Sequence, residues 1–158
     1  MSGIVVSGSG SIESIIEKDG VYASVTVGRS MRPLFKTHRD MVILERCADM
    51  PKKYDVVLYR IGEKYILHRI IGIDNERKCF VIRGDNTYKK EYVPFGKIIA
   101  RLTSFKRKGK GGKVDGRGYK IYTRVWNFIY PVRYVFHLFR SLAAKIYHAV
   151  FKRKEAKK

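Results

Sequence analysis

The sequence has little cysteine, few acidic residues and no long apolar run. Its two cysteines, Cys47 and Cys79, are too few for a disulfide framework or a four-ligand zinc site, so we expect two reduced thiols and no bound metal or cofactor. No window of about 18–20 apolar residues occurs, which predicts that no segment spans a bilayer. The first 20 residues also lack the basic and apolar stretches of a secretory signal peptide. These absences predict a cytoplasmic protein.

Acidic residues are scarce mainly in the last third of the chain. The 158 residues carry 34 Lys and Arg against 14 Asp and Glu, a net charge of +20. Residues 1–105 hold 18 basic and 12 acidic residues, whereas residues 106–158 hold 16 and 2. A segment this basic attracts polyanions such as anionic lipid, nucleic acid or acidic proteins. The excess charge therefore bears on the last third and says little about chemistry elsewhere.

Hydrophobic residues make up 45% of the chain, enough for a packed core. Residues 11–19 predict a short helix that Ser11 caps and Gly20 ends. Short alternating or β-branched segments then recur every 10–15 residues with turn residues between them, a pattern typical of a small, coiled, mainly β domain. The predicted strands are residues 21–27, 41–45, 55–61, 64–74, 78–84 and 97–105.

Three parts are predicted along the chain: a β-domain over 1–105, a basic glycine-rich linker over 106–118, and a basic amphipathic helical tail over 119–158. Pro131 should break or kink the tail helix. The aromatic and basic residues of the tail favour peripheral contact with an anionic membrane surface, or packing on the domain or on a partner. Nucleic acid is a less favoured partner, because no recognised nucleic-acid module is present.

A candidate nucleophile lies in the segment VGRSMRPLF, residues 27–35. Ser30 follows Gly28 and Arg29 at the end of a predicted strand, and Pro33 prevents that strand from continuing. A serine on such a sharp turn exposes its hydroxyl, and backbone N–H groups beside it can face a developing oxyanion. A serine hydroxyl becomes a good nucleophile only when a base takes its proton, so the chain must also supply a base.

Among the four histidines, His68 is the candidate base, because it lies in an apolar strand where an imidazole must be hydrogen-bonded or functional. The segment RGDNTYKKE adds Asp85 and Glu91, either of which could orient a histidine. Lys64 lies on the same strand face as His68 and ranks below it as a base. The structural alternatives are a hydrogen-bonded core histidine and a turn serine without chemistry.

The order of these motifs resembles that of the signal peptidase I and LexA-like serine peptidase superfamily. The resemblance covers residues 21–105, and its motifs are specific in combination and weak singly. Because His68, followed by Arg69, stands at the base position, the chain is most similar to the Ser–His branch, the endoplasmic-reticulum and archaeal type. The matching segments are GRSMRPLF (28–35), DVVLY (55–59), LHRIIGI (67–73), RGDN (83–86) and KIIARL (97–102).

This resemblance implies a hydrolase, a serine endopeptidase that cleaves an extended leader or signal-like peptide or preprotein. Ser30 would be the nucleophile and His68 the general base, with Glu91 or Asp85 orienting the base. The alternative is a non-catalytic scaffold of the same fold that binds peptide, membrane or nucleic acid. The residues implied to shape the nucleophile turn and oxyanion site are Gly28, Arg29, Met31 and Pro33.

The chain departs from the family pattern in three respects. Glu91 stands where the family has aspartate, which leaves open whether Glu91 or Asp85 orients His68. Gly28 offers no hydroxyl to an oxyanion site, so that site would rest on backbone N–H groups. The N-terminal membrane helix of signal peptidases has no counterpart among the predicted elements.

Overall fold

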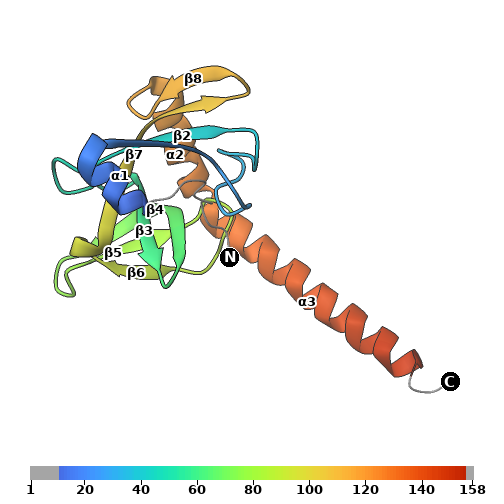
Figure 1. Cartoon of the computed structure of the whole chain (residues 1–158). Coiled ribbons are helices and arrows are strands. Elements are labelled where there is room, and N and C mark those ends of the chain that lie inside the picture. Colours follow the sequence, from blue (N-terminus) through green and yellow to red (C-terminus); the bar gives the residue numbers. More distant parts are fainter. Residues whose placement is uncertain (1–10, 156–158) are drawn as a thin grey trace. The chain divides into compact units, whose positions relative to one another are not determined.

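The computed structural model describes residues 11–155, which fall into two units, the first ending at Ile121 and the second beginning at Tyr122. The first unit contains an eight-stranded antiparallel sheet, and the second is helical (Figure 1). The predicted fold class is confirmed, because the chain is mainly β with a short N-terminal helix and C-terminal helices. The elements are α1 (Ile12–Asp19), β1 (Val21–Val25), β2 (Met41–Glu45), β3 (Val56–Ile61), β4 (Lys64–Asp74), β5 (Cys79–Arg83), β6 (Glu91–Pro94), the short 3-10 helix η1 (Phe95–Lys97), β7 (Ile98–Arg107), β8 (Lys110–Lys113), α2 (Arg117–Phe128) and α3 (Tyr130–Glu155).

Helix α1 begins and ends where its capping residues predict. The Ser14 N–H donates to the hydroxyl of Ser11 at 3.2 Å, which satisfies one of the unpaired donors of the first turn. Gly20 adopts the left-handed conformation, with φ of 73°, and its N–H bonds the carbonyl of Ile16. Ile12 and Ile16 are buried one turn apart, so a single apolar stripe packs the helix onto the sheet unit.

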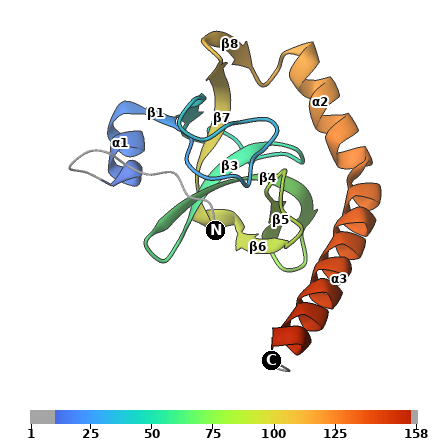
Figure 2. The same cartoon turned by 90° about the vertical axis from the view of Figure 1, so that its right-hand side faces the viewer.

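The sheet follows the order β1-β2-β7-β3-β4-β5-β6. Strand β8 pairs with the C-terminal part of β7 (Figure 2). Strands β3 and β4 form a hairpin around Gly62, whose φ of 58° suits a tight turn. Register shifts interrupt the pairing of β7 with β2 and with β3, and of β4 with β5. Such irregularities bend and twist strands, which coils this sheet around its core.

The structure differs from the sequence-based expectation over residues 106–118. These residues complete β7, reverse at Lys108 and Gly109, and return as β8 before α2 begins at Arg117. Their glycine-rich composition is typical of a linker, but backbone pairing with β7 needs no side-chain pattern. The compact sheet unit consequently extends to Ile121.

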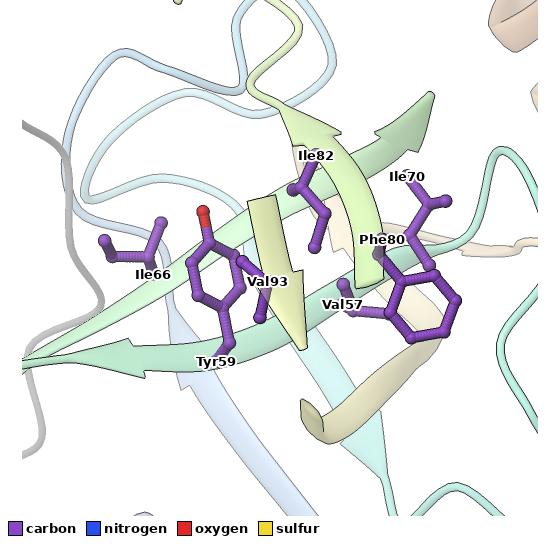
Figure 3. Packing of buried hydrophobic residues seen from close by; sticks show 7 residues of the cluster. All are labelled: Val57, Tyr59, Ile66, Ile70, Phe80, Ile82 and Val93. Atoms are coloured by element: carbon purple, nitrogen blue, oxygen red, sulfur yellow. The ribbon is translucent and has the colours of Figure 1, made fainter. Parts of the chain in front are cut away.

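One face of the sheet holds an apolar cluster (Figure 3). The antiparallel register places its members opposite one another, as in the pairs formed by Tyr59 with Ile66 and by Ile70 with Ile82. Each fully buried large side chain contributes about 1.5–3 kcal/mol relative to exposure, so this cluster is a principal source of stability. Its members are Val57, Tyr59, Ile66, Ile70, Phe80, Ile82 and Val93.

The helical break predicted at Pro131 lies where α2 gives way to α3. Helix α2 ends at Phe128 and α3 begins at Tyr130, which puts Pro131 in the first turn of α3. Proline is tolerated there because the first helical N–H groups lack intrahelical partners anyway. Within residues 11–155, no helix combines the length and apolar character required to cross a membrane.

Candidate active site

The loop that carries Ser30 is fixed at its base by hydrogen bonds between its two ends. Strand β1 stops at Val25, so Ser30 lies on this loop and not directly at the end of the strand. The Thr26 N–H donates to the carbonyl of Asp40 at 2.9 Å. The buried Asp40 carboxylate in turn accepts the Lys36 N–H at 2.8 Å. These bonds rigidify residues 26–40 although they form no regular strand or helix.

Ser30 opens a tight turn whose apolar residues point into the core. The Phe35 N–H bonds the carbonyl of Met31 at 3.0 Å, and Met31, Leu34 and Phe35 are all buried. Gly28 has a φ of 99°, and its carbonyl accepts a hydrogen bond from the hydroxyl of Thr37. Ser30 itself is 7% exposed. Of the other residues predicted to shape this turn, Arg29 and Pro33 are exposed.

The register of the sheet brings His68, Tyr59 and Glu91 together on the face that holds the apolar cluster. His68 lies on β4 opposite Val57 of β3, and Glu91 opens β6 opposite Ile82 of β5. Nδ1 of His68 lies 3.3 Å from Oε2 of Glu91 and 3.1 Å from the hydroxyl of Tyr59. The Tyr59 hydroxyl, which points away from β3 in Figure 3, donates to the same carboxylate oxygen. A histidine, a carboxylate and a phenol thus form one hydrogen-bonded group.

The charges in this group fix which nitrogen of His68 carries a proton. The hydrogen bond with His68 lowers the pKa of Glu91, Tyr59 lowers it further, and partial burial opposes both, so Glu91 is an anion at neutral pH. Burial and the nearby Glu91 raise the pKa of Tyr59, so its phenol remains a donor. An anionic acceptor at Nδ1 favours the tautomer with its proton on Nδ1 and a free lone pair on Nε2.

Nε2 of His68 is directed toward the space beside Ser30. It is buried, and among residues 11–155 it has no hydrogen-bond partner. A Cβ atom built on Gly84 would lie 2.9 Å from this nitrogen, 3.0 Å from Cβ of Ser30 and 2.8 Å from the Ser30 carbonyl oxygen. Nε2 and Ser30 therefore border the same small space, and any side chain at position 84 would enter it.

The turn that follows β5 holds the Ser30 loop in place. The Asn86 N–H donates to the carbonyl of Ser30 at 2.7 Å, and the Asn86 side-chain amide donates to the carbonyl of Arg29 at 3.3 Å. Together with the close approach at Gly84, these bonds explain why a GDN turn lies here. Gly84 leaves room for the serine, and Asn86 fixes its backbone.

Asp85 has a different partner from Glu91. Its two carboxylate oxygens accept hydrogen bonds from Nε and Nη2 of Arg69 at 2.7 and 2.8 Å, and both side chains are buried. Burial opposes the charge of Arg69, but Asp85 outweighs it and raises the pKa of the guanidinium. Arg69 also donates to the carbonyl of Tyr54 and to the hydroxyl of Tyr119 on α2. Of the two carboxylates that sequence left open, the one in contact with His68 is that of Glu91.

Lys64 does not reach the site. It is exposed at the start of β4, four residues from His68, which corresponds to about 13 Å along a strand. Tyr59 and Arg69, in contrast, are site residues that sequence reasoning missed. Pairing β3 with β4 around Gly62 would have indicated Tyr59, because the same register puts its side chain beside that of His68.

No group of three or more His, Cys, Asp and Glu side chains that could hold a metal ion occurs within the described part of the chain. Cys47 is half-buried, Cys79 is buried, and both are free thiols. The polar groups gathered near Ser30 are the imidazole of His68, the carboxylate of Glu91 and the phenol of Tyr59.

The chain matches no protein-family model, and no curated protein is significantly similar to it. The resemblance to the signal peptidase and LexA-like superfamily stays a prediction, carried by the order of the motifs.

Proposed function

We propose that this protein is a serine endopeptidase in which Ser30 is the nucleophile and His68 the general base. The observation that carries the proposal is the different surroundings of the two ring nitrogens. Nδ1 meets Glu91 and Tyr59, whereas the buried Nε2 borders the space beside Ser30. A base held at one nitrogen and unpartnered at the other is what nucleophilic serine catalysis requires.

The proposed reaction is acyl transfer in two halves. Oγ of Ser30 bonds to the carbonyl carbon of the scissile peptide while Nε2 of His68 takes the hydroxyl proton. As the C–N bond breaks, His68 returns that proton to the departing amine and leaves an acyl-enzyme. Water then attacks the ester carbonyl with His68 again as base, the carboxylic acid product leaves, and Ser30 regains its proton.

Glu91 and Tyr59 act by holding His68 in the reactive state. The Glu91 carboxylate stabilises the imidazolium that forms when Nε2 accepts a proton, and it fixes the orientation of the ring. The Tyr59 hydroxyl donates to that carboxylate and so limits its movement. Tyr59 is a positioning residue in this scheme, because it contacts the ring and the carboxylate and not the substrate.

The proposed substrate is a peptide in extended conformation, such as the leader segment of a larger peptide or a signal-like segment. Strand β6, which supplies Glu91, ends the path of the sheet. An edge strand offers unpaired backbone groups to an incoming peptide, and such pairing recognises extended chains with little regard to sequence. A small residue before the cut bond is expected on the resemblance alone.

Labelling with a serine-directed fluorophosphonate tests the proposed nucleophile. We expect a single adduct, located on Ser30 by peptide mass spectrometry, that is absent in Ser30→Ala and formed much more slowly in His68→Ala. Ser24→Ala serves as the control, because the Ser24 hydroxyl on β1 donates to the carbonyl of the neighbouring Val25. This variant should be labelled at the same rate as the wild type. Labelling of Ser30 that is unaffected by His68→Ala would contradict the assignment of the base.

A further inference from the structure

Large apolar side chains form an exposed stripe along the second unit. They recur at intervals of three and four residues, the spacing that keeps side chains on one side of a helix. Each is more than half exposed, although burying one such side chain contributes about 1.5–3 kcal/mol. The apolar stripe, a name used here for these six residues, comprises Val125, Phe128, Val132, Phe136, Phe139 and Leu142.

The opposite side of the same helices is polar, aromatic and basic. The guanidinium of Arg133 lies 3.7 Å from the centre of the Trp126 ring, and Trp126 stacks on Tyr122. Arg140 lies two turns after Arg133 and Ala144 one turn further, both exposed. The helices thus present an apolar side over residues 125–142, while the other side of α3 carries the cations Arg133 and Arg140.

Acidic residues are missing from this part of the chain. Between Asp115 and Glu155 the sequence contains nine Lys and Arg residues and no Asp or Glu. A second copy of the segment would bring like charges together, which opposes self-association through the apolar stripe. Nucleic acid would neutralise the cations but offers phosphates, not an apolar phase, to Phe136 and Phe139. An anionic bilayer surface matches both sides of the helices, because the apolar stripe can be buried among acyl chains and the cations can pair with headgroup phosphates.

We infer that the apolar stripe and the flanking basic residues of α2 and α3 bind the surface of an anionic lipid bilayer. The helices lie parallel to the surface, with the stripe in the boundary between headgroups and acyl chains. Arg and Lys side chains reach from this depth to the headgroup phosphates by extending their aliphatic stems. No described helix is long and apolar enough to cross a membrane, which agrees with binding in the plane of the surface.

Flotation of the full chain with phosphatidylcholine vesicles, with and without phosphatidylglycerol, tests this inference across a salt series. We expect binding only when phosphatidylglycerol is present, with the partition coefficient falling as salt rises. Phe139→Gln should lower the coefficient about 10-fold, because one buried Phe is lost. Ala144→Gln is the matched control, since it makes an uncharged change on the polar side of α3, and it should stay within about twofold.

A second pair of variants separates charge from apolar burial. Arg140→Gln removes one exposed cation and should lower binding to phosphatidylglycerol vesicles about fivefold, with the difference vanishing at high salt. Circular dichroism of each variant establishes that helix content is retained.

Three results would overturn the inference. The first is no flotation of the wild type with anionic vesicles. The second is equal flotation of Phe139→Gln and the wild type. The third is a dimer or a nucleic-acid complex, detected by analytical ultracentrifugation or gel shift, that needs Phe139 while vesicle binding does not.

Discussion

At the scale of single residues, the site depends on the different surroundings of the two ring nitrogens of His68. Nδ1 is committed to Glu91 and Tyr59, and Nε2 faces the space that Ser30 borders. Neither half suffices alone, because a base must be both oriented and unpartnered at the reacting nitrogen. Gly84 leaves the space beside Nε2 open, because any larger residue at this position would put a Cβ atom 2.9 Å from that nitrogen.

Replacing Gly84 with alanine should lower turnover about 100-fold with little change of fold. The added Cβ would lie 2.9 Å from Nε2 and 2.8 Å from the Ser30 carbonyl oxygen, so serine and histidine must move apart. A displacement near 1 Å costs about 100-fold in rate. Kinetics with a cleavable peptide measure the loss, and Gly96→Ala is the control because a Cβ at Gly96 meets nothing within 4 Å. Full activity of Gly84→Ala would show that nucleophile and base do not meet there.

Glu91 should make stability depend on pH in the acid range. Hydrogen bonds from His68 and Tyr59 hold its folded-state pKa below the unfolded value of about 4.3. An acid with a depressed pKa stabilises the folded state at pH values above the unfolded pKa, and this contribution is lost as pH falls through the folded pKa. Urea unfolding from neutral pH down to pH 3 should therefore show a steeper decline for the wild type than for Glu91→Gln.

The control for this measurement is Glu17→Gln, an exposed carboxyl on α1. It should decline with pH as the wild type does. If the free energy of unfolding declined with pH equally in the wild type and in Glu91→Gln, Glu91 would not be stabilised as an anion by His68 in the folded state.

At the scale of elements, one loop presents Ser30 and a neighbouring turn holds that loop in place. The loop from Thr26 to Asp40 presents Ser30, and the turn after β5 clamps that loop through Asn86. The same turn contains Asp85, whose bond to Arg69 ties it to β4, and Arg69 continues to Tyr119 on α2. His68 and Glu91 thus lie on one face of the sheet, while this buried ion pair fixes the turn beside Ser30.

Asp85→Asn should destabilise the fold. Breaking a buried ion pair costs about 3 kcal/mol, because Arg69 would keep its charge without its partner. The matched control is Asp49→Asn, which removes an exposed partner of Arg101 and should cost less than about 1 kcal/mol. The free energy of unfolding in urea measures both. A small cost for Asp85→Asn would assign Asp85 a role other than bracing the turn.

The sequence predicted the elements whose side chains follow a pattern and missed those that form through the backbone alone. The helix at 11–19 and six strands have capping residues or apolar alternation, and the structure contains them within two residues at each end. Strand β8 has the sequence KGGK, which carries no apolar side, and it exists because β7 offers backbone partners. Strand β6 is four residues long and ends in Pro94, so its pattern is too short to read.

For the site, motif order predicted Ser30, His68 and the two candidate carboxylates but not how they pair. The choice between Glu91 and Asp85 depends on which carboxylate the fold brings to His68. Glu91 opens β6 on the sheet face of His68, whereas Asp85 lies in the turn after β5 and bonds Arg69. The ring of Tyr59 belongs to the apolar cluster, and its hydroxyl acquires a role in the site only because it lies beside Glu91. Arg69 was missed as the partner of Asp85 because sequence alone does not pair residues so far apart.

At the scale of the whole molecule, the proposed chemistry and the proposed membrane contact lie in different units. Ser30, His68 and Glu91 belong to the unit that ends at Ile121, and the apolar stripe belongs to the unit that begins at Tyr122. The scarcity of acidic residues follows the same division, since Asp115 and Glu155 are the only acidic residues after Glu91.

This division predicts that the two activities separate cleanly by mutation. Ser30→Ala should float with phosphatidylglycerol vesicles as the wild type does, because the serine takes no part in the apolar stripe. The measurement is the same flotation series, with Phe139→Gln as the variant that does lose binding. Loss of flotation in Ser30→Ala would mean that the two units are coupled.

The most direct test of the proposed activity is N-terminal peptide mass spectrometry of cells that express the wild type or Ser30→Ala at equal levels. We predict a set of new N-termini present with the wild type and absent with Ser30→Ala, and likewise absent with His68→Ala. The residues on either side of each cut would define the specificity, with a small residue next to the cleaved bond. Identical sets of N-termini in the wild type and Ser30→Ala would contradict the assignment of this protein as a peptidase.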